Sequence, residues 1–166
     1  MLSINEYRHA ASATLAALLL GGCAVQQVLP GMTRAEVLAQ YGKPSREVPI
    51  ANGASVSRLQ YSFQPTGQQA VMVDLDASGK VVSSHQVMQS AEFARIVINQ
   101  WSRADVEREF GPGATIDRVA SWKGDIMTYY WKDASQDLYF YVYLDSANIV
   151  QRTGQGMDFR KEPPRD

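Results

Sequence analysis

Cysteine and histidine are scarce in this sequence, and neither sign of charge is in excess. Its 166 residues include one Cys and two His, and 16 basic residues stand against 17 acidic ones, which gives a net charge of −1. A single Cys forms no disulfide within the chain and no cysteine-based zinc site. A near-neutral chain lacks the clustered basic excess that is typical of nucleic-acid binding. We therefore expect no metal, no cofactor and no nucleic-acid partner.

Long apolar runs are also absent, with one exception near the N-terminus. Ala10 to Leu20 form an apolar run of about 11 residues after Arg8, which is far short of the ~20 that a membrane-spanning helix needs. A short apolar run behind a thin positive segment is typical of a signal peptide, and we assign residues 1–22 to one.

The only Cys follows this run directly. Leu20 to Cys23 read Leu-Gly-Gly-Cys, which resembles a bacterial lipobox. The resemblance implies cleavage before Cys23, a diacylglyceryl group on its thiol, acylation of the new amino group, and a tether at residues 23–30. Ala24 stands where an Asp would favour inner-membrane retention in the enteric sorting pattern, so we expect an outer-membrane lipoprotein that faces the periplasm. The alternative is a buried free Cys at the end of a short helix.

The rest of the chain contains one unit twice. The residues from Thr33 to Gly42 align with those from Ser102 to Gly111, 69 positions later. Thr33 and Ser102 are typical helix N-caps, and an acidic residue three positions after each completes a capping box. Gly42 and Gly111 predict left-handed C-caps. Each copy is therefore expected to contain one short capped helix here.

After each helix, the apolar pattern changes to a period of two, which predicts strands. The fold class we expect is α+β, with two tandem repeats at 31–89 and 90–158. In each repeat, short helices are expected to pack on one face of an antiparallel sheet. Residues 159–166 are expected to form a disordered tail. A leading helix of the second copy is expected at Ala91–Gln100. The expected strands are Leu59–Phe63, Val71–Leu75, Val81–Met88, Met127–Trp131, Leu138–Leu144 and one from Ile149, with further short strands at Arg46–Pro49 and Arg118–Ser121.

The first copy carries a more specific motif. Gly31-Met32-Thr33, then Val37 and Gly42-Lys43-Pro44, resemble the helix-opening and helix-closing motif of the BamE/SmpA/OmlA lipoproteins, and the hairpin from Leu75 to Val81 is similar to their last strand turn. The resemblance implies a small periplasmic α+β fold held at the outer membrane. The tandem arrangement also resembles the β-lactamase-inhibitor-protein fold, whose two copies present a concave binding sheet. The second copy departs from the motif, with Gln100-Trp101 in place of Gly31-Met32.

Few residues carry the pattern of a catalytic site. His85 and Ser83 share one face of a predicted strand, but nucleophilic catalysis also needs an orienting carboxylate. Asp74, Asp76 and Asp145 could suggest paired carboxylates, yet Asp76 and Asp145 lie at predicted hairpin turns, where Asp is favoured for local hydrogen bonding. We interpret His85 as an ordinary strand residue and expect no enzymatic activity.

The clearest binding signal is aromatic. Tyr139, Tyr141 and Tyr143 alternate with apolar residues along one predicted strand of the second copy. Aligning Leu144-Asp145 with Leu75-Asp76 turns these Tyr side chains away from the core, whereas an alignment anchored at Trp131 turns them inward. In the first case they predict a protein-binding surface, because Tyr and Trp favour interfaces. The residues expected on that surface are Tyr139, Tyr141, Tyr143, Trp122, Tyr130 and Trp131.

The whole pattern predicts a lipid-anchored, non-catalytic module that binds another envelope protein. The β-barrel assembly machinery is a candidate partner, with a role in outer-membrane protein assembly or envelope integrity. The alternative is a binder or inhibitor of a periplasmic or secreted enzyme, such as a β-lactamase.

Overall fold

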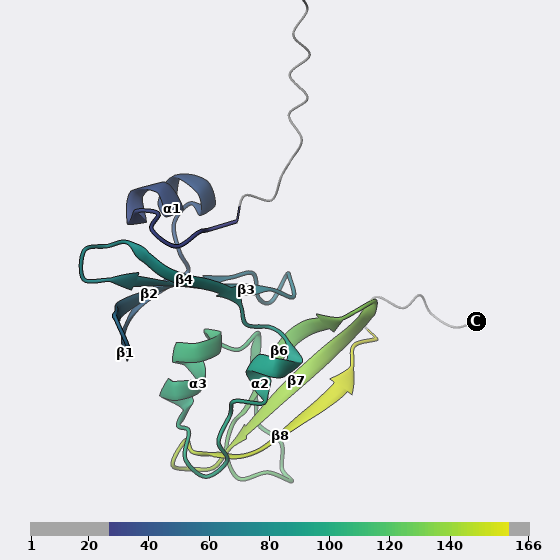
Figure 1. Cartoon of the computed structure of the whole chain (residues 1–166). Helices are drawn as coiled ribbons and strands as arrows, with labels where there is room; N and C mark the ends of the chain where they lie inside the picture. Colours follow the sequence, from purple (N-terminus) through teal and green to yellow (C-terminus); the bar gives the residue numbers. More distant parts are fainter. Residues whose placement is uncertain (1–26, 160–166) are drawn as a thin grey trace, which may run out of the picture.

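The computed structural model describes residues 27–159, which form two four-stranded antiparallel sheets and three short helices (Figure 1). The α+β fold class is therefore as expected. The signal peptide, Cys23 and nearly all of the expected C-terminal tail lie outside the described residues.

The first sheet has the strand order β1-β2-β3-β4 and is built entirely from the first copy. Its elements are α1 (Arg34–Tyr41), β1 (Arg46–Asn52), β2 (Ser55–Ser62), β3 (Ala70–Asp76) and β4 (Val81–Gln86). The expected strand at 46–49 is therefore present, and it extends to Asn52.

The second sheet has the order β5-β6-β7-β8 and is built from the second copy. Its elements are α2 (Ser90–Phe93), α3 (Arg103–Phe110), β5 (Thr115–Asp117), β6 (Ile126–Asp133), β7 (Gln136–Leu144) and β8 (Val150–Met157).

The helices α1 and α3 begin as the sequence predicts. The Thr33 hydroxyl accepts a hydrogen bond from the Glu36 amide, and the Glu36 carboxylate accepts one from the Thr33 amide at 2.7 Å. That backbone hydrogen bond holds the pKa of Glu36 below its ordinary value. Ser102 and Asp105 form the same reciprocal pair at the start of α3. Each capping box satisfies amide groups that a helix N-terminus otherwise leaves unpaired.

The strand register fixes the alignment of the copies. Tyr61 pairs with Val71 and Tyr129 pairs with Phe140, so equivalent residues are 68 positions apart along β2 and β6 but 69 apart along β3 and β7. The Tyr61 hydroxyl donates to the Gly42 carbonyl at 3.1 Å, and the Tyr129 hydroxyl donates to the Gly111 carbonyl at 2.8 Å. The turns at Asp76 and Asp145 also close in the same way, with each aspartate amide bonded to the carbonyl four residues later. Leu75-Asp76 is therefore equivalent to Leu144-Asp145. This is the alignment that turns the β7 tyrosines away from the core.

The two copies stack in alternating layers: α1, the first sheet, α3 with α2, and the second sheet (Figure 1). One face of the first sheet packs on α1 through Val37, Leu59 and Val73. Its other face contributes Ala70 and Met72 to the core of the second copy. Both faces of β3 are consequently buried, and the copies share a core.

A loop of the first copy completes this contact. The short strand β5 pairs only with Ile126–Thr128, so it leaves the rest of that edge of β6 without a strand partner. The Gln64 side-chain amide fills part of the gap, since it donates to the Tyr130 carbonyl at 2.6 Å and accepts from the Tyr130 amide at 3.0 Å. Gln68 donates to the next carbonyl, that of Trp131, at 3.1 Å.

Two expected elements are wrong. The helix expected at Ala91–Gln100 ends after the short helix α2. The chain continues in turns, and the Trp101 carbonyl accepts a hydrogen bond from the Val150 amide at 2.8 Å. A helix that continued to Gln100 would prevent this contact. The strand expected at Arg118–Ser121 is a loop that follows β5. Its turn closes between the Trp122 amide and the Val119 carbonyl at 3.0 Å.

Candidate binding surface

The outward face of the second sheet carries a continuous row of aromatic rings. We call Trp122, Tyr143, Tyr141, Tyr139 and Tyr130 the aromatic ladder. The alternating residues of β7, such as Phe140 and Val142, lie in the core instead. The β7 tyrosines are half-buried, and only Tyr130 is buried, with 7% of its surface exposed.

Neighbouring rings of the ladder touch along its whole length. The ring centroids lie 5.3 Å apart for Trp122 and Tyr143, 6.3 Å for Tyr143 and Tyr141, 5.8 Å for Tyr141 and Tyr139, and 5.5 Å for Tyr139 and Tyr130. These separations are within the range of favourable aromatic pairs. The ladder is therefore ordered before any partner binds, which lowers the entropy cost of using it for binding.

Glycines on β8 make room for the rings of the ladder. Gly154 lies opposite Tyr141 in the sheet, and Gly156 lies opposite Tyr139. A Cβ at Gly156 would lie 3.3 Å from the Tyr141 hydroxyl, so the ring occupies space that a side chain there would fill. The Tyr141 and Tyr143 rings therefore lie against the β8 backbone at these two glycines.

Charged residues flank the ladder on both sides. The Arg152 guanidinium lies over Tyr143, 3.9 Å from the ring centroid, and over Trp122 at 5.1 Å. On the other side, the Asp117 carboxylate accepts from the Thr115 hydroxyl at 2.9 Å. Between them, burial raises the pKa of Tyr141, with a smaller contribution from nearby acidic groups. One of these acidic groups is Asp158, which follows β8 and is 7% exposed.

The ladder brings together five of the six residues that the sequence assigned to a binding surface. Trp131 is the exception, because it lies on the opposite face of β6, where it is 2% exposed and packs edge-on against Phe93 at 5.3 Å. It belongs to the core and is not available to a partner. Whether the other five residues bind a protein stays a prediction.

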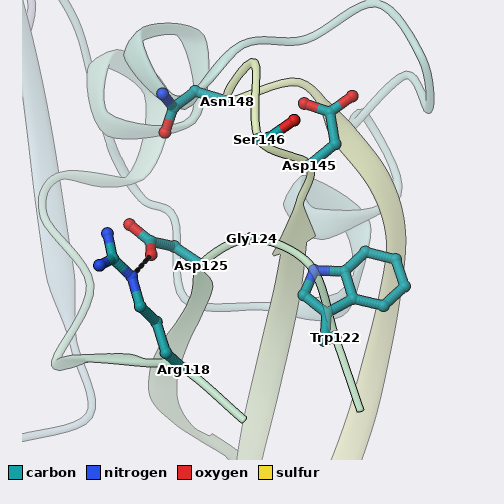
Figure 2. Close-up of a pocket in the computed structure, with 7 residues that line it drawn as sticks. All are labelled: Arg118, Trp122, Gly124, Asp125, Asp145, Ser146 and Asn148. Atoms are coloured by element: carbon teal, nitrogen blue, oxygen red, sulfur yellow. Dashed lines mark hydrogen bonds and ion pairs between the residues drawn. The ribbon is translucent and has the colours of Figure 1, made fainter. Parts of the chain in front are cut away.

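One end of the ladder borders a shallow pocket of about 340 Å3 (Figure 2). Asp125 pairs there with Arg118 and also with Arg103 from α3. The hydrogen bond to Arg118 holds the pKa of Asp125 below its ordinary value. Slight burial opposes this shift, and Arg103 adds to it. The Trp122 indole donates to the Leu144 carbonyl at 2.7 Å. These contacts hold the β5–β6 loop against the end of β7 and fix Trp122 at the end of the ladder.

The residues considered for catalysis do not assemble a nucleophilic site. The Ser83 hydroxyl donates to Asp74 at 3.5 Å, and His85 lies opposite Met72 on the next strand. Both Asp74 oxygens are already held by Arg58, at 2.6 and 2.9 Å. Asp76 and Asp145 close hairpin turns, as the sequence predicts.

Sequence reasoning missed a buried ionic cluster between the copies, formed by Arg58, Asp74 and Glu109. Arg58 is 2% exposed and donates to Glu109 of α3 at 2.8 Å, besides its two bonds to Asp74. Burial opposes its charge, yet hydrogen bonds to both carboxylates raise the pKa of Arg58 overall. Its neighbour Gln60 donates to the Glu107 and Arg108 carbonyls at 2.8 and 3.0 Å. These contacts cover the face of the first sheet that is equivalent to the ladder face of the second.

No helix within residues 27–159 is long and apolar enough to cross a membrane. No group of three or more His, Cys, Asp or Glu side chains in that range is arranged to hold a metal ion.

Comparisons with known proteins assign no family. No protein-family model matches the sequence, and no curated protein matches it. Among solved structures, the chain is similar to a DUF4309 family protein (YjgB) from Bacillus subtilis, with 13% sequence identity and a TM-score of 0.32, over 76% of this chain and 78% of that chain. At this level of similarity, nothing about function is inferred from that protein.

Proposed function

We propose that this protein is a lipid-anchored, non-catalytic module that binds another envelope protein through the aromatic ladder. Its anchor is Cys23 in the lipobox-like segment, and its location is the periplasmic side of the outer membrane. Its context is outer-membrane protein assembly or envelope integrity, in line with the resemblance of its first copy to the BamE/SmpA/OmlA lipoproteins.

The observation that carries this proposal is a difference between equivalent faces of the two sheets. In the first sheet, the face with Arg58, Gln60 and Met72 is covered by the second copy. In the second sheet, the equivalent face carries the ladder, and its β7 tyrosines stay half-exposed although Ile126, Thr128 and Tyr130 of β6 are buried. A half-exposed row of Tyr and Trp is the composition that protein interfaces favour.

The position of the tether is compatible with this use. The described chain begins beside α1, at the opposite end of the stack from the ladder (Figure 1). A lipid attached through the preceding residues would therefore leave the ladder free for a partner.

The anchor is tested by replacing Cys23 with Ala. We expect Cys23→Ala to abolish labelling by radioactive fatty acid and to release or mislocalise the protein, because no other thiol is available. Ala24→Asp is a matched control that should keep the label and shift the protein towards the inner membrane in a host with enteric sorting. Continued labelling of Cys23→Ala would contradict the anchor.

Binding is tested by crosslinking tagged protein in intact envelopes. The test variant changes Tyr139, Tyr141 and Tyr143 to Ala, and circular dichroism verifies that it is folded. Phe63→Ala, at an exposed aromatic of the first copy, is the control. Recovery of β-barrel assembly components with the wild type and the control, but not with the Tyr variant, supports the proposal. Recovery of a soluble enzyme favours the inhibitor alternative. If the Tyr variant still recovers every partner of the wild type, the role of the ladder is contradicted.

A further inference from the structure

The ladder face carries opposite charges at the two ends of one row. The strand register places Asp117, Ile126, Tyr143 and Arg152 side by side on β5, β6, β7 and β8. Three strand spacings separate the two charged residues, or roughly 14 Å between backbones. Neither Asp117 nor Arg152 forms an ion pair with any residue in the range 27–159. Within residues 27–159, each of these charges therefore lacks an ion-pair partner.

We propose that the partner of the ladder face is a second copy of this chain, packed face to face about a two-fold axis. This inference rests on the proposed use of the ladder as a binding surface and names its occupant. The axis runs parallel to the strands, between β6 and β7. Rotation about it places β8 of each copy over β5 of the other, and β7 over β6. Arg152 of each copy then meets Asp117 of the other, so the two unpaired charges form two equivalent ion pairs.

The shape of the face fits the same operation. The rotation places the Tyr143 ring over Ile126 and the Tyr141 ring over Thr128, so that a tall side chain meets a shorter one in both rows. Gly154 of β8 comes to lie over Thr115. Two sheets with strands aligned in this way pack about 10 Å apart, at an angle of about 30°. A two-fold axis lying across the strands would instead separate Arg152 from Asp117, so the charges select one of the two arrangements.

The size of the face predicts a weak dimer. Four strands spaced ~4.8 Å apart, over about five residues each, cover only a few hundred Å2 per copy, which is below the ~800 Å2 per partner of a standard stable interface. Tethering to one membrane raises the effective concentration of such a pair without any new contact. A two-fold axis normal to the bilayer lets both tethers reach the same surface.

A charge-reversal cycle tests the proposal on the full chain in mild detergent. Sedimentation velocity measures association up to about 1 mM for the wild type, Arg152→Glu, Asp117→Arg and the double variant. Each single reversal sets like charges against each other twice per dimer, so we expect the dissociation constant to rise on the order of tenfold. The double variant restores opposite charges and should return to within about threefold of the wild type. Lys43→Glu changes an exposed charge of the first copy by the same amount and should have no effect.

The outcomes separate this inference from the proposed function. The dimer is overturned if the wild type is monomeric at ~1 mM. It is also overturned if the single reversals leave association unchanged, or if the double variant does not regain the association of the wild type. If the chain stays monomeric while the Tyr variant loses an envelope partner in crosslinking, the proposed function stands and only the identity of the partner is wrong. If neither association nor crosslinking depends on the ladder, both proposals fail.

Discussion

Gly42 and Gly111 end equivalent helices with a backbone conformation that side chains disfavour. Their φ angles are +74° and +78°, with ψ angles of −157° and 179°, and each amide donates to the carbonyl four residues earlier. The positive φ agrees with the prediction, but the left-handed helical conformation that was expected is wrong, because ψ is extended. This region is almost exclusive to glycine. The extended ψ turns the chain directly away from the helix.

Gly42→Ala should therefore destabilise the protein by about 1–3 kcal/mol. Apart from the adjoining backbone, no atom of residues 27–159 lies within 4 Å of where the Cβ would be, so the expected cost comes from the backbone conformation and not from a clash. Urea unfolding followed by circular dichroism measures it. Ala39→Gly, on an exposed position of α1, is a control for altered helix propensity and should cost less than about 1 kcal/mol. An unchanged midpoint for Gly42→Ala would show that this position tolerates a side chain.

Glu109 makes the stability of the fold depend on pH. Burial disfavours its charge, but the hydrogen bond and ion pair with Arg58 outweigh burial and hold its pKa below the ordinary value. The folded chain consequently binds protons at this site less readily than the unfolded chain, whose Glu has a pKa of about 4.3. The stabilisation from this carboxylate is complete at neutral pH and is lost as the pH falls below about 4 towards the folded-state pKa.

Glu109→Gln should lower the free energy of unfolding by about 1–3 kcal/mol at pH 7, because it removes one carboxylate from a buried ionic cluster. At about pH 3 the difference from the wild type should shrink, since the unfolded chain is protonated at this site there and the stabilisation from the lowered pKa of Glu109 is partly lost. Urea titrations of both proteins at the two pH values measure this. A difference that is equal at both pH values would mean that the Arg58 contact contributes nothing through charge.

At the scale of elements, the β2–β3 loop serves as a substitute for a strand. Gln64 bonds to both backbone groups of Tyr130 along the edge that β5 leaves unpaired. Gln64→Ala should cost about 1–2 kcal/mol, because two hydrogen bonds of the β6 backbone are lost. Amide hydrogen exchange should also speed up at Tyr130. Gln155→Ala, on an exposed position of β8, is the control, and unchanged protection of the Tyr130 amide in Gln64→Ala would contradict this role.

Local patterns predict the elements of this fold better than the contacts between them. The capping boxes at Thr33 and Ser102, and the period-two strands, depend on residues a few positions apart, and the structure has them where the sequence indicates. The Arg58 cluster joins residues 16 and 51 positions apart, so no local pattern reveals it. One signal was present: Arg58 and Asp74 lie in apolar strands at positions where the second copy has Ile126 and Tyr143. Charged residues in such strands indicate a buried partner.

The candidate surface was only partly predictable for a similar reason. The alternation along β7 shows that its tyrosines share a face, but it does not say which face is outward. That choice depends on whether Leu75-Asp76 or another point anchors the alignment, and the matching hydrogen bonds of the turns at Asp76 and Asp145 decide it. Trp131 was misplaced because it is adjacent to Tyr130 in the chain, and adjacent strand residues lie on opposite faces.

At the scale of the whole molecule, the layered stack makes the two copies depend on each other. The face of the first sheet with Met72 and the Arg58 cluster is buried only while the second copy is folded over it. Unfolding of the second copy alone would expose this apolar and charged surface together, and an unpaired buried charge is costly. The chain is therefore expected to unfold as one cooperative unit, although its sheets are each built from a separate half of the sequence.

The three Trp residues provide a direct test, because all of them lie in the second copy. Gly42→Ala weakens only the first copy, at α1. If the copies unfold together, the variant lowers the midpoint of the Trp fluorescence transition as much as that of circular dichroism, since coincident transitions are the signature of two-state unfolding. If the first copy unfolds alone, circular dichroism shows an earlier partial transition while the Trp midpoint stays at the wild-type value. The second result would mean that the shared core and the Arg58 cluster are too weak to couple the copies, and the stack would then be two independent domains in contact.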